Sequence, residues 1–267
     1  MTDVHDADAL RETAARLHGA HRTGKPVGSP SREGAVTTLA DAYRVQAEVL
    51  RLHTAPGRRI TGLKAGLTSV TARRAVEGAT EPVLGRLTDG MFRTGRLLLD
   101  SGELIRPRAE PALLFVLGAP LEGPRVSAVD ALRAVEFVLP ALEITDSRVE
   151  DGPATVLDLA ADNAGCHAVV LGTEPVRPAD TDLRLTGHVL YRDGAIVATG
   201  ATGMALGSPV AALAWAANAR ENEGEFPLTA GSSVLVSGFA TPTDLLPGST
   251  VTASLAGLGT ATVTRSR

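Results

Sequence analysis

The chain has 267 residues and a net charge of −4, and no basic cluster recurs along one face, which argues against nucleic acid as a partner. A single cysteine, Cys166, excludes an internal disulfide framework and is compatible with a reducing compartment. No apolar run approaches the roughly 18 residues of a membrane span, and the N-terminus lacks the apolar segment of a signal peptide, so we expect a soluble, cytoplasmic protein without membrane partners.

The first 95 residues are predicted to be mostly helical. Apolar residues recur at helical spacing over residues 6–20 and again from about 38 to 53. Residues 59–67 are predicted to form a strand, and a short helix over 70–76 can be capped by Thr68 or Ser69. Residues 81–96 are expected to form an irregular bridge, with a domain boundary near Gly95.

The pattern after Gly95 is rich in strands, and Asp193-Gly194 is a hairpin-turn signal. Strands and helices do not alternate regularly, which argues against a doubly wound parallel sheet and predicts an α+β fold. We therefore divide the chain into a helical region, 1–95, and a β-rich catalytic region, 96–267. Strands are predicted at 97–99, 108–117, 138–145, 167–171, 183–191, 196–202, 233–237, 250–256 and 261–264, and helices at 128–136, 156–162 and 209–222.

Two carboxylates interrupt apolar strands of the β-rich region. Glu110 lies in the strand 108–117 and Glu143 in the strand 138–145. Because a buried carboxylate without a partner is costly, two such intrusions suggest one shared, oxygen-rich site for a hard divalent cation. The alternative is two unrelated glutamates, one paired with Arg106 or Arg108 and the other with Arg148.

Lys64 is the second unusual feature, because the chain has only one other lysine, Lys25. It stands among glycines and small apolar residues, where burial would depress its pKa unless an anion lies close. A cation at this position can meet a substrate carboxylate or enolate. The alternative is a lysine whose ammonium group reaches solvent.

Five motifs in unbroken order resemble the 2-oxopent-4-enoate hydratase and 4-oxalocrotonate decarboxylase family, within the fumarylacetoacetate hydrolase superfamily. The resemblance runs from about Asp41 to the C-terminus. The motifs are Gly62-Leu63-Lys64-Ala65-Gly66-Leu67-Thr68-Ser69, Pro107-Arg108-Ala109-Glu110-Pro111, Glu143-Ile144-Thr145-Asp146-Ser147-Arg148, Ala161-Asp162-Asn163-Ala164, and Leu206-Gly207-Ser208-Pro209 followed by Trp215 and Asn218.

This resemblance implies a helical N-terminal region followed by a mixed β-roll catalytic domain, assembled as a homo-oligomer. It also implies Mg²⁺ or Mn²⁺ held by Glu110 and Glu143, with the metal stabilising an enolate as a Lewis acid. Lys64 would be the electrostatic catalyst next to the substrate oxygens. Thr68, Ser69 and Asn163 would be polar groups that line the pocket and bind the substrate.

The chain departs from the family pattern at three positions. Ala112 replaces the second Glu of the family's E-x-E segment, so metal binding is expected to be weakened or absent. Val83 replaces an acid that the family uses near the substrate, and Gly165 replaces a serine. Hydration needs a proton relay, which Val83 cannot supply, whereas decarboxylation or tautomerisation needs only an electron sink and a cation.

The sequence therefore predicts a lyase-type enzyme, hydratase- or decarboxylase-like, acting on a 2-oxo or enolic unsaturated acid through a diverged site. One alternative is a recruited, metal-independent isomerase or cyclase of a biosynthetic pathway. Another is a non-catalytic scaffold or ligand-binding relative. Cys166 and His167 are interpreted as structural, because adjacent strand residues point to opposite faces.

Overall fold

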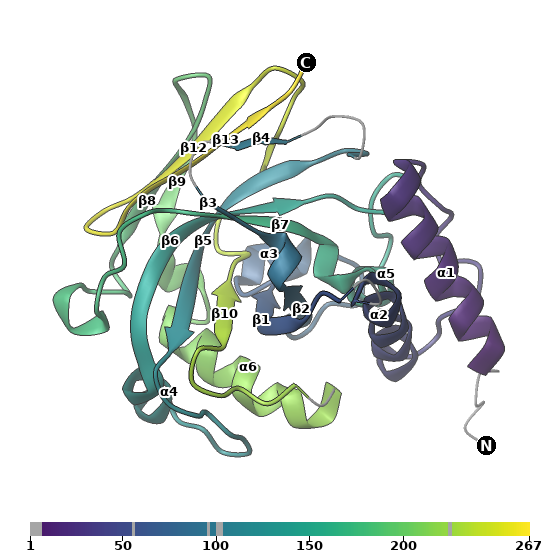
Figure 1. Cartoon of the computed structure of the whole chain (residues 1–267), viewed down its shortest axis with the longest axis horizontal. Helices are drawn as coiled ribbons and strands as arrows, with labels where there is room; N and C mark the ends of the chain where they lie inside the picture. The colour runs from purple at the N-terminus through teal and green to yellow at the C-terminus, as the bar shows by residue number, and fades with distance from the viewer. Residues whose placement is uncertain (1–6, 55–56, 95–96, 100–103, 224–225) are drawn as a thin grey trace.

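Two β-sheets and the helices around them make up the protein (Figure 1). The computed structural model describes residues 7–54, 57–94, 97–99, 104–223 and 226–267. The eight-stranded sheet has the order β2-β1-β10-β5-β6-β7-β3, and β11 pairs with β5 in addition. Its strands are β1 (Ile60–Gly66), β2 (Val83–Thr88), β3 (Phe92–Thr94), β5 (Arg108–Leu117), β6 (Val135–Thr145), β7 (Cys166–Leu171), β10 (Ser233–Val236) and β11 (Thr243–Asp244).

The five-stranded sheet lies at the upper left of Figure 1 and has the order β4-β13-β12-β8-β9. Asp193 and Gly194 join β8 to β9 with φ values of 52° and 83°, as a tight hairpin turn requires, which confirms the turn predicted there. The strands are β4 (Leu97–Leu99), β8 (Gly187–Arg192), β9 (Ala195–Ala201), β12 (Thr250–Leu255) and β13 (Gly259–Arg265).

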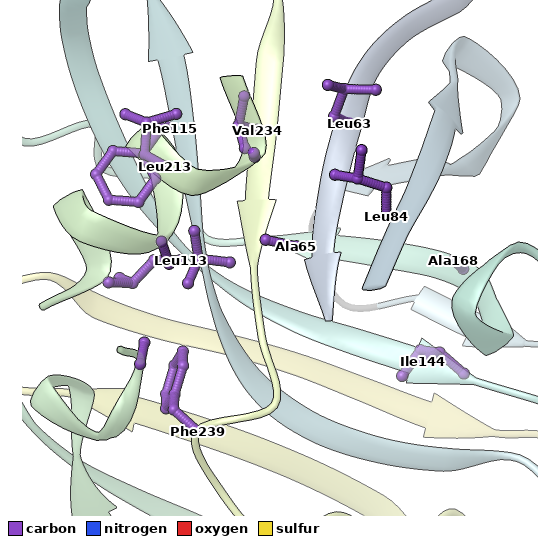
Figure 2. Packing of buried hydrophobic residues seen from close by; sticks show 14 of the residues in the cluster. Leu63, Ala65, Leu84, Leu113, Phe115, Ile144, Ala168, Leu213, Val234 and Phe239 are labelled. Atoms are coloured by element: carbon purple, nitrogen blue, oxygen red, sulfur yellow. The ribbon is translucent and has the colours of Figure 1, made fainter. Parts of the chain in front are cut away.

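Along β1, successive side chains point alternately to the two faces of the larger sheet. Leu63 and Ala65 belong to the main apolar core, which Leu213 of α6 joins from one side of the sheet, close to Phe115 in Figure 2. Lys64 lies between them and therefore points to the opposite face. The helices are α1 (Ala7–Thr23), α2 (Leu39–Thr54), α3 (Val70–Arg74), α4 (Ala128–Ala134), α5 (Val156–Ala161) and α6 (Pro209–Glu223). In the described part of the chain, no helix combines the length and hydropathy needed to cross a bilayer.

The α+β class and most predicted elements are confirmed, but the expectation for residues 81–96 was wrong. This segment forms β2 and β3, which pair with β1 and β7. Gly85 interrupts the apolar pattern of β2 because a Cβ there would come within 2.9 Å of the Asn163 carbonyl oxygen. The helix predicted at 128–136 is also shorter, since β6 already begins at Val135.

The boundary predicted near Gly95 lies outside the described residues, and the division into two regions stays a prediction. Strands β1, β2 and β3 precede this point, yet they complete the sheet that β5, β6, β7 and β10 form after it. The first region therefore supplies part of the same sheet as the second.

Histidines lie where α1 and α2 meet β7. The ring centroids of His21 and His53 are 4.5 Å apart, and those of His21 and His167 are 5.4 Å apart. Burial is the largest effect on the three imidazoles, and together with the charge of Arg148 and other neighbouring cationic groups it lowers the pKa of His21 and of His53 to about 3 and that of His167 to about 4. These imidazoles are therefore neutral in the folded protein at pH 7.

We predict that this cluster makes the fold sensitive to acid. Because the folded-state pKa values lie below the unfolded value near 6.5, the unfolded chain binds more protons, so the stability is present above pH 6.5 and is lost as the pH falls toward 4. Replacing His53 by Phe should reduce the loss of unfolding free energy between pH 7 and pH 5 by on the order of 1 kcal/mol. Urea unfolding at both pH values measures this, and an unchanged loss would contradict it.

Candidate active site

Lys64, Glu110 and Glu143 come together on one face of the larger sheet. Lys64 lies on β1, and Glu110 and Glu143 are directly paired in the register of β5 and β6. The ammonium group of Lys64 forms an ion pair with Glu143 and donates a hydrogen bond of 2.6 Å to the carbonyl oxygen of Ala164. All three side chains are buried.

The backbone around Lys64 is shaped to hold the ammonium group in this position. A Cβ on Gly66 would lie 3.1 Å from Cε of Lys64 and 3.6 Å from its Nζ, so the glycine leaves the space that the lysine side chain occupies. Burial is the largest single effect on the pKa of Lys64 and lowers it, but the acidic groups around the ammonium, of which Glu143 contributes most, together outweigh burial and raise the pKa above its ordinary value. Lys64 is therefore a fixed positive charge at neutral pH.

Glu110 is in a different state from Glu143. Its Oε2 accepts a hydrogen bond of 3.1 Å from the backbone N–H of Gly238. Burial, together with the nearby charge of Glu143, raises the pKa of Glu110 to about 8. Two carboxylates facing each other cannot both stay charged at low cost beside one lysine, so Glu110 carries the proton.

The alternative pairings of the two glutamates are wrong. Arg106 pairs with Asp151 at 2.6 Å, and Arg108 pairs with Asp244 at 3.3 Å.

Arg148 pairs with Asp162 at 2.5 Å and also donates to the carbonyl oxygens of Asp146 and Asp162. Arg148 thus joins the segment that follows β6 to the loop that follows α5. Arg148 therefore does not pair with Glu143, and the partner of Glu143 is Lys64.

The structure separates the three polar residues predicted to bind the substrate. Ser69 lines the pocket and caps α3, where its Oγ accepts from the N–H of Ala72 at 3.1 Å. Thr68 and Asn163 are not among the residues that line the pocket, and their substrate-binding role stays a prediction. Thr68 donates its hydroxyl to the carbonyl of Ser237, because the chain after β1 must be held against the end of β10.

Asn163 instead positions the backbone next to Lys64. Its amide group pairs with the N–H and the C=O of Arg86, at 2.7 and 2.9 Å. Asn163, Ala164 and Gly165 all have positive φ values, of 52°, 53° and 72°. This turn directs the carbonyl of Ala164 at the ammonium group, a role that a backbone atom plays and that no side-chain motif reveals.

The three departures from the family pattern lie at or beside the site. Val83 and Gly165 line the pocket, and Val83 approaches the space above Gly66 where the Lys64 side chain lies. Ala112 is buried two residues from Glu110 and belongs to a small apolar cluster. No carboxylate, hydroxyl or other proton carrier stands at these three positions.

Cys166 lies on the site's side of β7, whereas His167 faces His21. Burial, reinforced by Glu143, raises the pKa of the Cys166 thiol well above its usual range. The thiol stays protonated and is a poor nucleophile. The two residues do not act as a nucleophile and base pair.

The site opens into a pocket of about 910 Å³ between α3, the end of β10 and strand β9. Lys64, Glu110 and Ser69 reach it as polar groups, and charged side chains of Arg106, Arg108, Glu150, Asp151 and Asp244 also line it, together with apolar residues such as Leu67, Val76, Val83 and Phe239. Glu143 is fully buried behind Lys64 and does not line it.

The oxygen donors of the site are few for a metal ion. Among residues that the structure describes, no three His, Cys, Asp or Glu side chains are arranged to hold a metal ion. Glu110 and Glu143 are adjacent, and the position beside Glu110 on the same strand face is Ala112. The set is two carboxylates, one fewer than the family pattern provides, so a cation here would need further oxygens from water or substrate.

Comparison with known proteins defines first the fold and then the family. A 4-oxalocrotonate decarboxylase from Pseudomonas putida G7, solved with magnesium and adipate, superimposes with a TM-score of 0.92 at 30% identity and covers 97% of this chain and 98% of its own. A fumarylpyruvate hydrolase from Pseudomonas aeruginosa, solved with Mn²⁺ and pyruvate, shares the fold with a TM-score of 0.57 at 13% identity, over 76% of this chain and 87% of its own. No family model matches the chain.

Among curated relatives, a 2-hydroxypent-2,4-dienoate hydratase from Pseudomonas putida is 36% identical over 80% of this chain and 96% of its own length. A 4-oxalocrotonate decarboxylase from Pseudomonas sp. strain CF600 is 36% identical over 83% of each chain. The chain therefore belongs to the 2-oxopent-4-enoate hydratase and 4-oxalocrotonate decarboxylase family. It is a lyase-type enzyme.

We predict that Lys64 and Glu143 stabilise the fold only as a pair. Lys64→Met should lower the unfolding free energy by about 3–5 kcal/mol, because it leaves Glu143 buried without a partner. Adding Glu143→Gln should recover most of this loss, since the replacement is neutral. Urea unfolding measures both variants, with Lys25→Met, which changes the exposed lysine, as the matched control. A Lys64→Met protein as stable as the control would contradict the pairing.

Proposed function

We propose that this protein is a lyase-type enzyme that acts on a 2-oxo or enolic unsaturated acid, with Lys64 as its electrostatic catalyst. The observation that carries the proposal is the Lys64 ammonium group, kept charged by Glu143 and aimed by the Ala164 carbonyl at the floor of a mostly apolar pocket. A fixed charge in a dry site stabilises a developing enolate without reorganising at the moment of reaction. Two relatives described above, a hydratase and a decarboxylase, are named for substrates of this kind.

Each residue of the site has one proposed role. Lys64 meets the carboxylate or 2-oxo oxygen of the substrate and stabilises the enolate oxygen. Glu143 keeps Lys64 charged, and Asn163 holds the turn that carries the Ala164 carbonyl. Ser69 can donate its hydroxyl hydrogen to a substrate oxygen, because its oxygen accepts from α3 and leaves that hydrogen free to turn to the pocket.

Glu110 and Glu143 would hold Mg²⁺ or Mn²⁺, weakly until a chelating substrate adds its oxygens. When bound, such a cation supplies Lewis-acid stabilisation of an enolate. Because the pKa of Glu110 is raised to about 8, a cation must displace the proton of Glu110, so its affinity should rise with pH.

The departures at Val83 and Gly165 favour chemistry other than hydration. Adding water across a double bond needs groups that carry a proton to and from the reacting carbons. Decarboxylation and isomerisation of a 2-oxo acid need mainly an electron sink. A metal-independent isomerase or cyclase is therefore the second candidate, which Ala112 and Val83 support. A non-catalytic role is disfavoured, because a buried charge pair is costly to keep without a use.

The family resemblance also motivates a homo-oligomer that works in the cytoplasm, and both points stay predictions.

We expect Lys64 to control the rate of enolisation. We also expect hydration to be slow. The wild type should exchange the C3 protons of an unsaturated 2-oxo acid for deuterium, which proton NMR follows. Lys64→Met/Glu143→Gln should exchange on the order of 100-fold more slowly, and Lys25→Met at the wild-type rate. Hydration of 2-hydroxypenta-2,4-dienoate, followed by its ultraviolet absorbance with Mn²⁺ present, should be far slower than in the hydratase from Pseudomonas putida. Equal exchange in the double variant would remove Lys64 from the mechanism, and efficient hydration would show that Val83 and Gly165 do not impair the relay.

Ala112→Glu should restore a metal site. It adds a third carboxylate on the strand face of Glu110, so Mn²⁺ should bind at least tenfold more tightly, a gain of about 1.4 kcal/mol. Without metal the variant should melt lower than the wild type, because it buries an unpaired charge. Melting temperatures with and without Mn²⁺ measure both effects.

Leu114→Glu is the matched control, since it puts the same charge two residues further along the same strand face. It should destabilise the fold without rescue by Mn²⁺. If Mn²⁺ also fails to rescue Ala112→Glu, Glu110 and Glu143 are not ligands.

A further inference from the structure

The pocket is far larger than its polar floor requires. Its volume of about 910 Å³ lies at the upper end of the roughly 300–1,000 Å³ of clefts that hold drug-sized ligands. The polar head of an oxo acid needs only the region around Lys64 and Ser69. The remaining walls include the apolar side chains of Leu67, Val76, Val83, Ile105, Leu159 and Phe239.

The apolar wall begins next to the catalytic lysine. An ideal Cβ on Gly66 would lie 3.1 Å from Cε of Lys64 and 3.5 Å from Cγ2 of Val83, so both side chains border the same small space. An acid at position 83 would favour a polar substituent on the first carbons beyond the head group. Val83 instead offers them an apolar contact.

The cations at the mouth of the pocket are already neutralised. Arg106 pairs with Asp151, and Arg108 pairs with Asp244 and donates to the carbonyl oxygen of Pro242. All four side chains line the pocket, and Glu150 adds a further negative charge. At this end of the pocket three acidic side chains thus outnumber the two arginines, whereas Lys64 is the cation at the floor, so a second carboxylate at the far end would face a net negative charge.

We propose that the substrate carries one acidic or enolic head and a bulky, uncharged, apolar tail that packs against the wall formed by Val76, Val83 and Phe239. This inference rests on the proposed function for the head group and goes beyond it by fixing the chemistry of the tail. It distinguishes the protein from an enzyme whose substrate is a short dicarboxylic acid.

A series of saturated 2-oxo acids of increasing length tests the tail by binding alone, with isothermal titration calorimetry and no turnover. From 2-oxobutanoate through 2-oxohexanoate to 2-oxooctanoate, the dissociation constant should fall by about fourfold for each buried methylene, which corresponds to about 0.8 kcal/mol. The six-carbon diacid 2-oxoadipate should bind at least tenfold more weakly than 2-oxohexanoate. A flat series, or tighter binding of the diacid, would overturn the proposal.

Two matched variants locate the wall. Val76→Asp puts a charge on the pocket side of the segment after α3, and Val70→Asp puts the same charge on an exposed residue of α3 that does not line the pocket. Val76→Asp should raise the dissociation constant of 2-oxooctanoate at least tenfold and change that of 2-oxobutanoate by no more than about twofold. Val70→Asp should change neither dissociation constant. Equal losses for both acids would show that Val76 does not contact the tail, and the proposal would fail.

The proposed function fails separately, through the deuterium exchange experiment. If the dissociation constant depends on chain length but the protein does not exchange C3 protons, the proposal about the tail stands and the proposed enolisation chemistry fails. If the protein exchanges C3 protons but the dissociation constant does not depend on chain length, the enolisation chemistry stands and the proposal about the tail fails.

Discussion

The ion pair between Lys64 and Glu143 is the interaction on which the site depends. Both side chains are almost completely buried, and taking either charge out of water alone would cost several kcal/mol. The pair is tolerable because β1 and β6 bring the two side chains into contact and the Ala164 carbonyl accepts a further hydrogen bond. Burial, together with the charge of the neighbouring Glu143, raises the pKa of Glu110 to about 8.

The surrounding fold holds this pair in place. One face of the larger sheet packs its side chains into the main core, with α6 against it, and the site uses the opposite face at the same strands. A second buried pair, Arg148 with Asp162, holds the turn that carries Asn163 and Ala164. Sheet pairing and one rigid turn thus fix the position of the Lys64 ammonium group.

Sequence patterns were sufficient for much of this arrangement. The strand over residues 108–117 has the bounds that were predicted, because its apolar run is long and ends at clear turn residues. Lys64, Glu110 and Glu143 were recognisable because charges inside apolar strands are rare.

Other parts could not be predicted from sequence, for physical reasons. Strand β2 was missed because Gly85 and the preceding Pro82 break the pattern that identifies a strand, and β3 was missed because it has only three residues. Thr68 and Asn163 were assigned to the substrate, yet both bond the backbone, and a hydroxyl or amide in a motif does not show which partner it takes. The Ala164 carbonyl carries no side-chain signal at all.

The histidines of α1 and α2 illustrate a further limit. Each lies on a helix with polar neighbours, and only packing against β7 shows that they form one partly buried cluster. Pairings between elements far apart in the chain follow from the whole fold rather than from local patterns.

The charge state of Lys64 is the most direct test of the account, and the chain is well suited to it. Lys64 and Lys25 are the only lysines, and Lys25 is exposed and serves as an internal reference. Nitrogen-15 NMR of the two Nζ groups from pH 6 to pH 9 would follow their protonation. We predict that Lys64 stays charged throughout and that its signal shifts when a 2-oxo acid binds. A Lys64 that loses its proton within this range would be a neutral amine, and the electrostatic role assigned to it would be wrong.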